Sequence, residues 1–144
     1  MPKLSLDIEY EIDFKIFGIV TPSQDFKFAH YLNDKLKLSL KRIKDREIFD
    51  NKSDIFQFFK QFHFIDKLDK IDYYLIKNKN LSSYCLPEFN IMDYLLLITG
   101  EKYSNQDKDL KQKLAEIKTV SSVLQIQPKQ VKNVENILID ECNF

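Results

Sequence analysis

The chain has 144 residues, the usual size of one domain, and we expect residues 1–144 to fold as a single unit. Its 22 basic and 22 acidic side chains balance, so no overall field favours binding to nucleic acid or to an anionic membrane. Its two glycines, Gly18 and Gly100, cannot form the glycine-rich loops that bind phosphate, so this class of site is excluded.

The first part of the chain has the pattern of a strand followed by a helix. Apolar side chains alternate with polar ones over residues 4–16, and the apolar run 16–20 indicates deeper burial. Apolar side chains at helical spacing then predict a helix over 24–37. Ser23 is expected to cap this helix, and Asp25 suits the positive end of its dipole.

The middle of the chain predicts three strands. Residues 38–43 alternate as in a short strand, and the charged segment 45–53 predicts a loop. Residues 54–65 are dense in phenylalanine; their spacing also suits a helix, but the aromatic density favours a strand. The polar segment 66–70 resembles a hairpin turn, which leads into a strand over 71–77.

The last part of the chain predicts a buried strand, a helix and shorter elements. Continuous Leu and Ile over 94–99 predict a strand that is buried on both faces. After it we expect an amphipathic helix ending near residue 118, a strand over 120–126, a helical turn over 128–132 and a short strand over 137–139. The predicted class is therefore α+β: a mostly antiparallel sheet with two main helices on one face, roughly in the order β-β-α-β-β-β-β-α-β-β.

The cysteines and histidines do not have the spacing of a metal or redox site. Cys85 and Cys142 lie far apart in the chain, and adding His30 and His63 still makes a poor set of zinc ligands. We therefore expect reduced thiols, no metal and no cofactor. The N-terminal residues lack the apolar core of a signal peptide, and no stretch approaches the roughly 20 apolar residues of a membrane span, so we expect a cytoplasmic protein.

Residues 86–94 read Leu-Pro-Glu-Phe-Asn-Ile-Met-Asp-Tyr. This segment resembles the signature of the IPExxxVDY family, a group of small bacterial proteins named for that motif. The identical positions are Pro87, Glu88, Asp93 and Tyr94, while Leu86 and Met92 are apolar substitutes for Ile and Val. Residues 13–19 and 29–40 also resemble that family's N-terminal half, so the resemblance covers most of the chain. The family has no established activity, and the resemblance implies a name without a mechanism.

The motif supports three interpretations. In the first, Glu88 and Asp93 accept hydrogen bonds from loop N–H groups and Tyr94 buries its ring, so the motif is architectural. In the second, the segment is a recognition surface for a partner or a small ligand, with candidate contacts at Leu86, Pro87, Glu88, Met92, Asp93 and Tyr94. In the third, Glu88 and Asp93 are a catalytic carboxylate pair, for which no third group of suitable type is evident.

One concentrated basic run follows the predicted helix. The candidate nucleic-acid contacts in it are Lys41, Arg42, Lys44 and Arg46, which come after Lys35 and Lys37. A solvated edge between helix and strand explains such a run. The alternative is a strip that contacts the backbone of RNA.

These patterns predict a non-catalytic interaction or accessory module that acts through a protein partner, because catalytic residue sets are missing and aromatic side chains are plentiful. One alternative is an RNA-associated protein that uses the basic run around Lys41 and Arg42. The other is a small enzyme built on Glu88 and Asp93. If the motif contacts the partner, Tyr94→Ala is expected to disrupt the complex without unfolding the chain.

Overall fold

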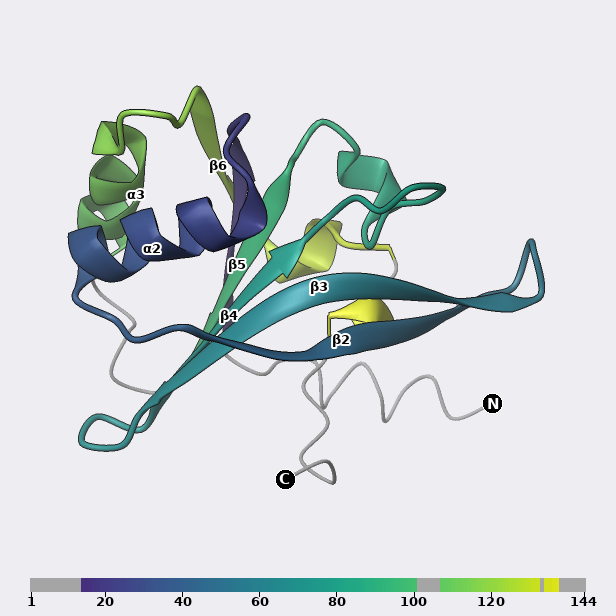
Figure 1. Ribbon diagram of the computed structural model, residues 1–144, viewed down its shortest axis with the longest axis horizontal. Coiled ribbons are helices and arrows are strands. Elements are labelled where there is room, and N and C mark those ends of the chain that lie inside the picture. Colours follow the sequence, from purple (N-terminus) through teal and green to yellow (C-terminus); the bar gives the residue numbers. More distant parts are fainter. Residues whose placement is uncertain (1–13, 101–106, 133, 138–144) are drawn as a thin grey trace.

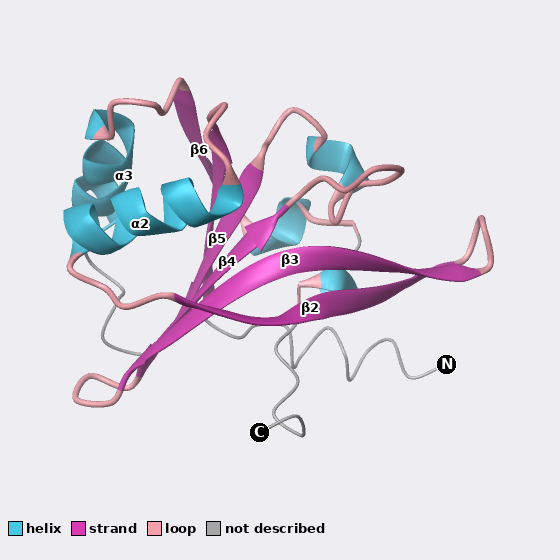
Figure 2. Ribbon diagram, viewed as in Figure 1, coloured by secondary structure: helices cyan, strands magenta, loops and turns pink. Residues whose placement is uncertain are grey.

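A six-stranded antiparallel sheet is the centre of the computed structural model, which describes residues 14–100, 107–132 and 134–137 (Figure 1). Both α-helices lie on one face of this sheet, which confirms the expected α+β class (Figure 2). The strands are β1 (Phe14–Val20), β2 (Lys41–Asp50), β3 (Ile55–Asp66), β4 (Ile71–Lys77), β5 (Tyr94–Thr99) and β6 (Ser122–Ile126). The helices are α2 (Asp25–Leu36) and α3 (Asp107–Glu116), with short 3-10 helices η1 (Pro87–Phe89), η3 (Pro128–Gln130) and η4 (Val134–Asn136).

The strands are arranged in the order β2-β3-β4-β5-β1-β6. Strands β2, β3 and β4 follow one another as hairpins, whereas β1 is inserted between β5 and β6. Ile16 of β1 therefore lies opposite both Leu97 of β5 and Ile126 of β6. This arrangement puts β5 and β1 in the interior of the sheet, where their apolar sequences are buried.

Each face of the sheet has its own apolar core. Tyr94, Leu96 and Ile98 of β5 face the helices, whereas Leu95 and Leu97 face the loops on the opposite side. The prediction that 94–99 is a strand buried on both faces is confirmed. The helices bury Phe28, Ala29, Leu32, Leu110 and Leu114 against the first face.

Helix α2 lies within one residue of its predicted bounds at each end, but its cap is different. Gln24 occupies the cap position without a side-chain hydrogen bond, so the expectation of Ser23 as the cap is wrong. Asp25 stands in the first turn as expected. The helix ends at Lys37, which adopts the left-handed conformation with φ 59° and donates its main-chain N–H to Asn33 O.

Strand β2 corrects the predictions for 38–43 and 45–53. The strand runs from Lys41 to Asp50, and the turn of the hairpin lies at 51–54. The prediction of a loop at 45–50 rested on charge alone and is wrong, because an edge strand tolerates charged side chains at its exposed positions. Between Ile43 and Arg46 the strand contains a β-bulge, which changes the faces of the residues that follow.

The β2–β3 hairpin is longer than the strands beside it. Strand β3 pairs with β4 only over residues 61–66, so residues 55–60 continue past β4 with β2 as their strand partner. Figure 1 shows the far end of this hairpin projecting from the body of the molecule. We refer to residues 47–58 as the arm.

The other predicted helices, strands and turns are confirmed or fall outside the described residues. The strand β6 and the helical turn η3 lie within the ranges predicted for them. The alternating segment up to residue 13 and most of the last predicted strand fall outside the part of the chain that the structure describes. Within the described part, no helix combines the length and the apolar character that crossing a membrane requires.

Candidate functional site

The motif residues form the loop that closes the second face of the sheet and leads into β5. Pro87 stands at the start of η1, and Leu86 before it is extended, with φ −119° and ψ 94°. Leu86 is fully buried in the core of this face. Met92 packs over Gly18 of β1 so closely that a Cβ at Gly18 would lie 2.6 Å from the Met92 sulfur. Both apolar motif residues are therefore core residues.

Asn78, just after β4, organises the motif loop from inside the protein. Its side chain is 0% exposed. Its Nδ2 donates to the carbonyl oxygens of Phe89 (3.0 Å) and Met92 (2.9 Å), and its Oδ1 accepts from the N–H of Leu86 (2.8 Å). Its main-chain carbonyl also accepts from the N–H of Cys85 (2.7 Å). One buried amide thus satisfies main-chain groups at both ends of the loop.

Asp93 connects the loop to the end of β1. Its Oδ2 accepts a hydrogen bond from the N–H of Thr21 (2.8 Å), and its main-chain N–H donates to Ile19 O (2.8 Å). Its Oδ1 lies 3.1 Å from Lys79 Nζ, a partly exposed ion pair. The carboxylate therefore has a structural partner on each oxygen.

Tyr94 is part of the core. It is 2% exposed, its ring stacks on Phe28 with centroids 4.8 Å apart, and its hydroxyl donates to Ser23 O at 2.7 Å. Burial raises the pKa of the Tyr94 hydroxyl well above its usual range, and the charges of Asp25 and Asp93 add to this. Tyr94→Ala would remove a core side chain, so the expectation that this variant keeps its fold is abandoned.

Glu88 has a different partner from Asp93. Its Oε2 accepts a hydrogen bond from the main-chain N–H of Lys132 (2.7 Å), which connects η1 to the segment after η3. Asp93 instead binds β1 and Lys79. Their known partners therefore place the two carboxylates in separate structural roles.

The histidines lie on other elements. His30 is exposed on α2, and His63 Nε2 lies 2.7 Å from Asp72 Oδ1 between β3 and β4. Among the described residues, no group of three or more His, Cys, Asp and Glu side chains has the geometry to hold a metal ion. Cys85 is buried, and burial raises the pKa of its thiol to about 12, so it stays protonated at neutral pH.

The basic run is divided between the two faces of the sheet. Arg42 lies over the Phe62 ring on the helix side and binds Asp45. After the bulge, Arg46 lies over the Tyr74 ring on the opposite side, and its Nε donates to Gln61 Oε1 (3.0 Å). Burial lowers the pKa of Arg46.

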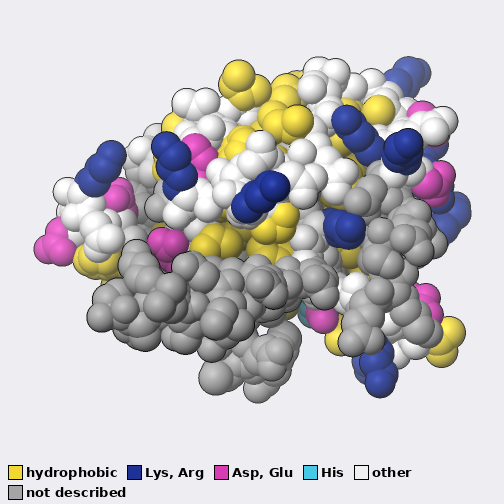
Figure 3. Space-filling model, turned by 180° about the vertical axis from the view of Figure 1, so that it is seen from behind, with side chains coloured by type: hydrophobic (Ala, Val, Ile, Leu, Met, Phe, Trp, Pro, Cys, Tyr) yellow, Lys and Arg dark blue, Asp and Glu magenta, His cyan; other side chains and the backbone are white. Residues whose placement is uncertain are grey.

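Lysines do not restore a continuous strip. Lys41 and Lys44 are exposed on β2, on either side of the partly buried Arg42. Figure 3 shows the basic side chains on the face it displays scattered among polar and apolar ones. Among the described residues, the basic run is therefore split between the two faces of the sheet and does not form one concentrated surface for nucleic acid.

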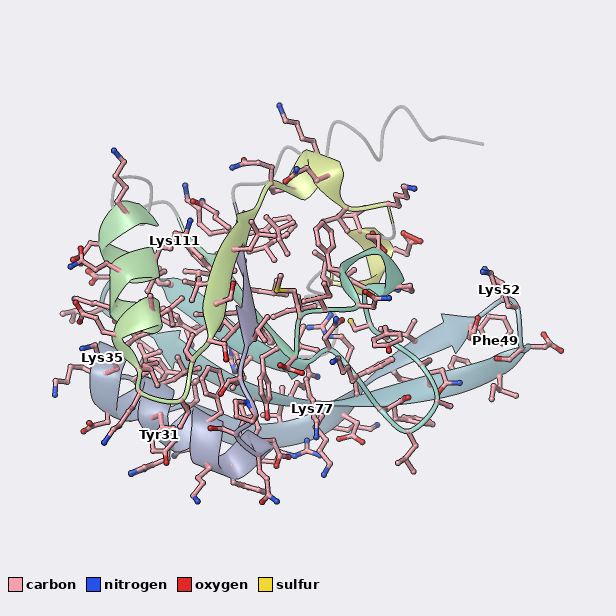
Figure 4. All side chains as sticks on the ribbon, turned by 90° about the horizontal axis from the view of Figure 1, so that it is seen from above. Tyr31, Lys35, Phe49, Lys52, Lys77 and Lys111 are labelled. Carbon is pink, nitrogen blue, oxygen red and sulfur yellow. The ribbon has the colours of Figure 1, made fainter. Side chains whose placement is uncertain are left out.

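The arm carries an exposed aromatic surface that the motif does not include. Phe49, Phe56 and Phe58 are 44%, 53% and 51% exposed, and they lie on the face of the sheet that carries the helices. The rings of Phe49 and Phe56 meet edge to face with centroids 5.1 Å apart. Figure 4 shows Phe49 and Lys52 at the end of the arm, away from the helices. We call Phe49, Phe56 and Phe58 the arm patch.

Comparisons of the sequence with known proteins assign no family to the chain. No protein-family model matches the chain, and no curated protein matches it. The resemblance of 86–94 to the IPExxxVDY signature therefore stays a prediction from the motif.

Asn78 and the arm patch are the two features that sequence reasoning did not find. Asn78 begins the polar segment 78–83, which has the composition of a linker. Phe56 and Phe58 have the same parity as the buried Phe62, so alternation assigns all three to a core face. Strand β3 has 12 residues and the neighbouring β4 has 7, and this difference in length is the signal that part of β3 extends beyond β4.

Proposed function

We propose that the chain is a non-catalytic interaction module that acts through a protein partner, and that the partner docks on the arm patch. The observation that carries the proposal is the exposure of Phe49, Phe56 and Phe58 together on a projecting hairpin. Aromatic side chains dominate the energy of protein interfaces because they bury a large area at a small cost in side-chain entropy.

The size of the arm patch supports an interaction surface. A phenylalanine can bury 150–250 Å², so three half-exposed rings present about 300 Å² of apolar surface. The largest apolar patch on a typical monomer covers about 300–600 Å² and is often functional, whereas isolated exposed apolar residues need no explanation. The patch is therefore sufficient for the apolar centre of an interface.

The charges of the arm favour a protein over a bilayer or a nucleic acid. Within 47–58 the acidic residues are Glu47, Asp50 and Asp54, and the basic residue is Lys52, so three negative charges and one positive charge leave −2. Inserting the arm into a membrane would carry Asp50 and Asp54 at its tip into the lipid, which is costly. The same net charge repels phosphate. An uncharged apolar surface on a protein has neither problem.

In this proposal the motif is architectural. Leu86, Asn78, Asp93 and Tyr94 hold the central strand and its entry loop, and the arm makes the contact. We further propose that the chain belongs to the IPExxxVDY family and acts in the cytoplasm without a cofactor; the motif residues support the first point.

The test compares arm and control variants in partner capture. We expect Phe56→Ser with Phe58→Ser to weaken partner binding at least about 30-fold, since each truncated aromatic contact at an interface centre costs about 1 kcal/mol or more. The partner is first isolated on the wild-type chain from native lysate, then purified, and its Kd is measured by calorimetry for each variant.

The matched control is Leu68→Ser with Leu81→Ser, which removes two exposed apolar side chains outside the arm. This control should bind as the wild type does. A partner that binds the arm variant and the control equally well, or a lysate that yields no stoichiometric partner, would count against the proposal.

A further inference from the structure

Strand β2 is an outer strand of the sheet along its whole length. In the described part of the chain, its one strand neighbour is β3. Its ten residues therefore present an outer edge of main-chain N–H and C=O groups to which another strand can pair. In some proteins such an edge pairs with another strand, and in others its side chains prevent that pairing. The side chains of the strand show which of the two applies.

The exposed charges along β2 change sign at its midpoint, where Asp45 and Arg46 are themselves partly buried. Lys41 and Lys44 are exposed in its first half, and Glu47 is exposed in its second half. Asp50 at the end is also acidic, although its carboxylate accepts hydrogen bonds within the turn that follows. A strand whose exposed charges are basic in one half and acidic in the other is complementary to an antiparallel copy of itself.

The bulge sets the register of such a pair. Gln61 lies opposite Ile43 and Phe59 lies opposite Arg46, so residues 44–45 together occupy one strand position. When a two-fold axis perpendicular to the sheet relates two antiparallel strands, the residue at the axis lies opposite the same residue of the other copy. With the bulge counted as one position, Arg46 is at the centre of the complementary register.

We infer that β2 pairs antiparallel with β2 of a second copy of this chain about a two-fold axis at Arg46. The cross-strand pairs of this register are Lys41 with Asp50, Arg42 with Phe49, Ile43 with Ile48, and Lys44 with Glu47. The Lys41–Asp50 and Lys44–Glu47 pairs join opposite charges, and the apolar pair joins Ile to Ile. The Arg46 pair at the axis joins like charges, and Asp45, which shares the bulged position with Lys44, is held in an ion pair with Arg42 of its own strand. The sheet becomes continuous across the two copies.

The two arginines of β2 are compatible with this arrangement. Both copies of Arg46 meet at the axis, but each guanidinium points back into its own sheet, bonded to Gln61 Oε1 and over the Tyr74 ring. Arg42 lies over Phe62 and would also face Phe49 of the second copy. Cations over aromatic faces are favourable contacts.

This inference rests on the edge of β2, and Phe49 is the one residue of the arm patch that lies on that strand. Phe56 and Phe58 lie on β3 and stay accessible in the paired form. A chain that fails to pair could still bind its partner, and the reverse also holds. The two tests therefore fail separately.

The test exchanges the charges of the Lys44–Glu47 pair. Lys44→Glu and Glu47→Lys each place two like-charged pairs in the homodimer, and each should weaken dimerisation about 30-fold. An equimolar mixture of the two variants should dimerise as the wild type does, because both pairs in the heterodimer again join opposite charges. Sedimentation equilibrium measures the dissociation constants on the purified chains.

The matched control is Lys67→Glu in the β3–β4 turn, which should leave dimerisation unchanged. Restoration by mixing also shows that both variants are folded. A wild-type chain that stays monomeric would show an edge protected by its lysines and bulge, and would overturn the inference. So would a dimer that neither variant weakens, since its interface would lie elsewhere.

Discussion

Tyr94→Ala will lower the free energy of unfolding by about 5 kcal/mol, a large part of the roughly 5–15 kcal/mol that stabilises a domain. The substitution empties a space in the helix-side core, where the ring stacks on Phe28. It also leaves Ser23 O without its hydrogen bond from the hydroxyl. Urea unfolding followed by circular dichroism measures the change.

Tyr94→Phe separates the ring from the hydroxyl. This variant keeps the packing and should cost about 1 kcal/mol, the usual net value of one hydrogen bond. If Tyr94→Ala were as stable as Tyr94→Phe, the ring would contribute nothing to the core and the architectural interpretation of the motif would be wrong.

Asn78→Ala is expected to cost about 4 kcal/mol of unfolding free energy. It removes three hydrogen bonds and leaves the Leu86 N–H and the Met92 carbonyl buried without this partner. Asn78→Asp should be at least as damaging, since a carboxylate cannot donate to the two carbonyl oxygens and its charge would be buried. Thermal and urea unfolding of the variants provide the values.

Asn90→Ala is the matched control, because Asn90 is an exposed asparagine in the same loop. This control should change stability by less than about 0.5 kcal/mol, as surface substitutions usually do. Equal effects at Asn78 and Asn90 would show that the loop does not depend on the buried amide.

The sequence predicted those parts of the fold that depend on a local pattern. The continuous apolar residues 94–99 predicted a fully buried strand because no polar face is needed in the interior of a sheet. The helix over 24–37 followed from its apolar stripe. The strand β2 did not follow, because its charged residues 45–50 are stabilised by pairing with β3, which local composition does not report.

The candidate site was partly predictable. The architectural interpretation of Glu88 and Asp93 follows from residue type, since carboxylates in loops accept main-chain hydrogen bonds. The importance of Asn78 could not be foreseen, because its partners lie 8 to 14 residues away along the chain. The arm patch was also hidden, since whether Phe56 and Phe58 are covered depends on how far β4 and α2 extend.

Residue-resolved amide hydrogen exchange on the free chain tests the central claim most directly. If the motif is architectural, the amides of Leu86 and Asp93 will exchange as slowly as those of β5, because both are bonded into the sheet framework. The amides of the turn at 51–54 will exchange much faster. Fast exchange at Leu86 and Asp93, with β5 still protected, would mean that the motif loop opens independently and would contradict the account.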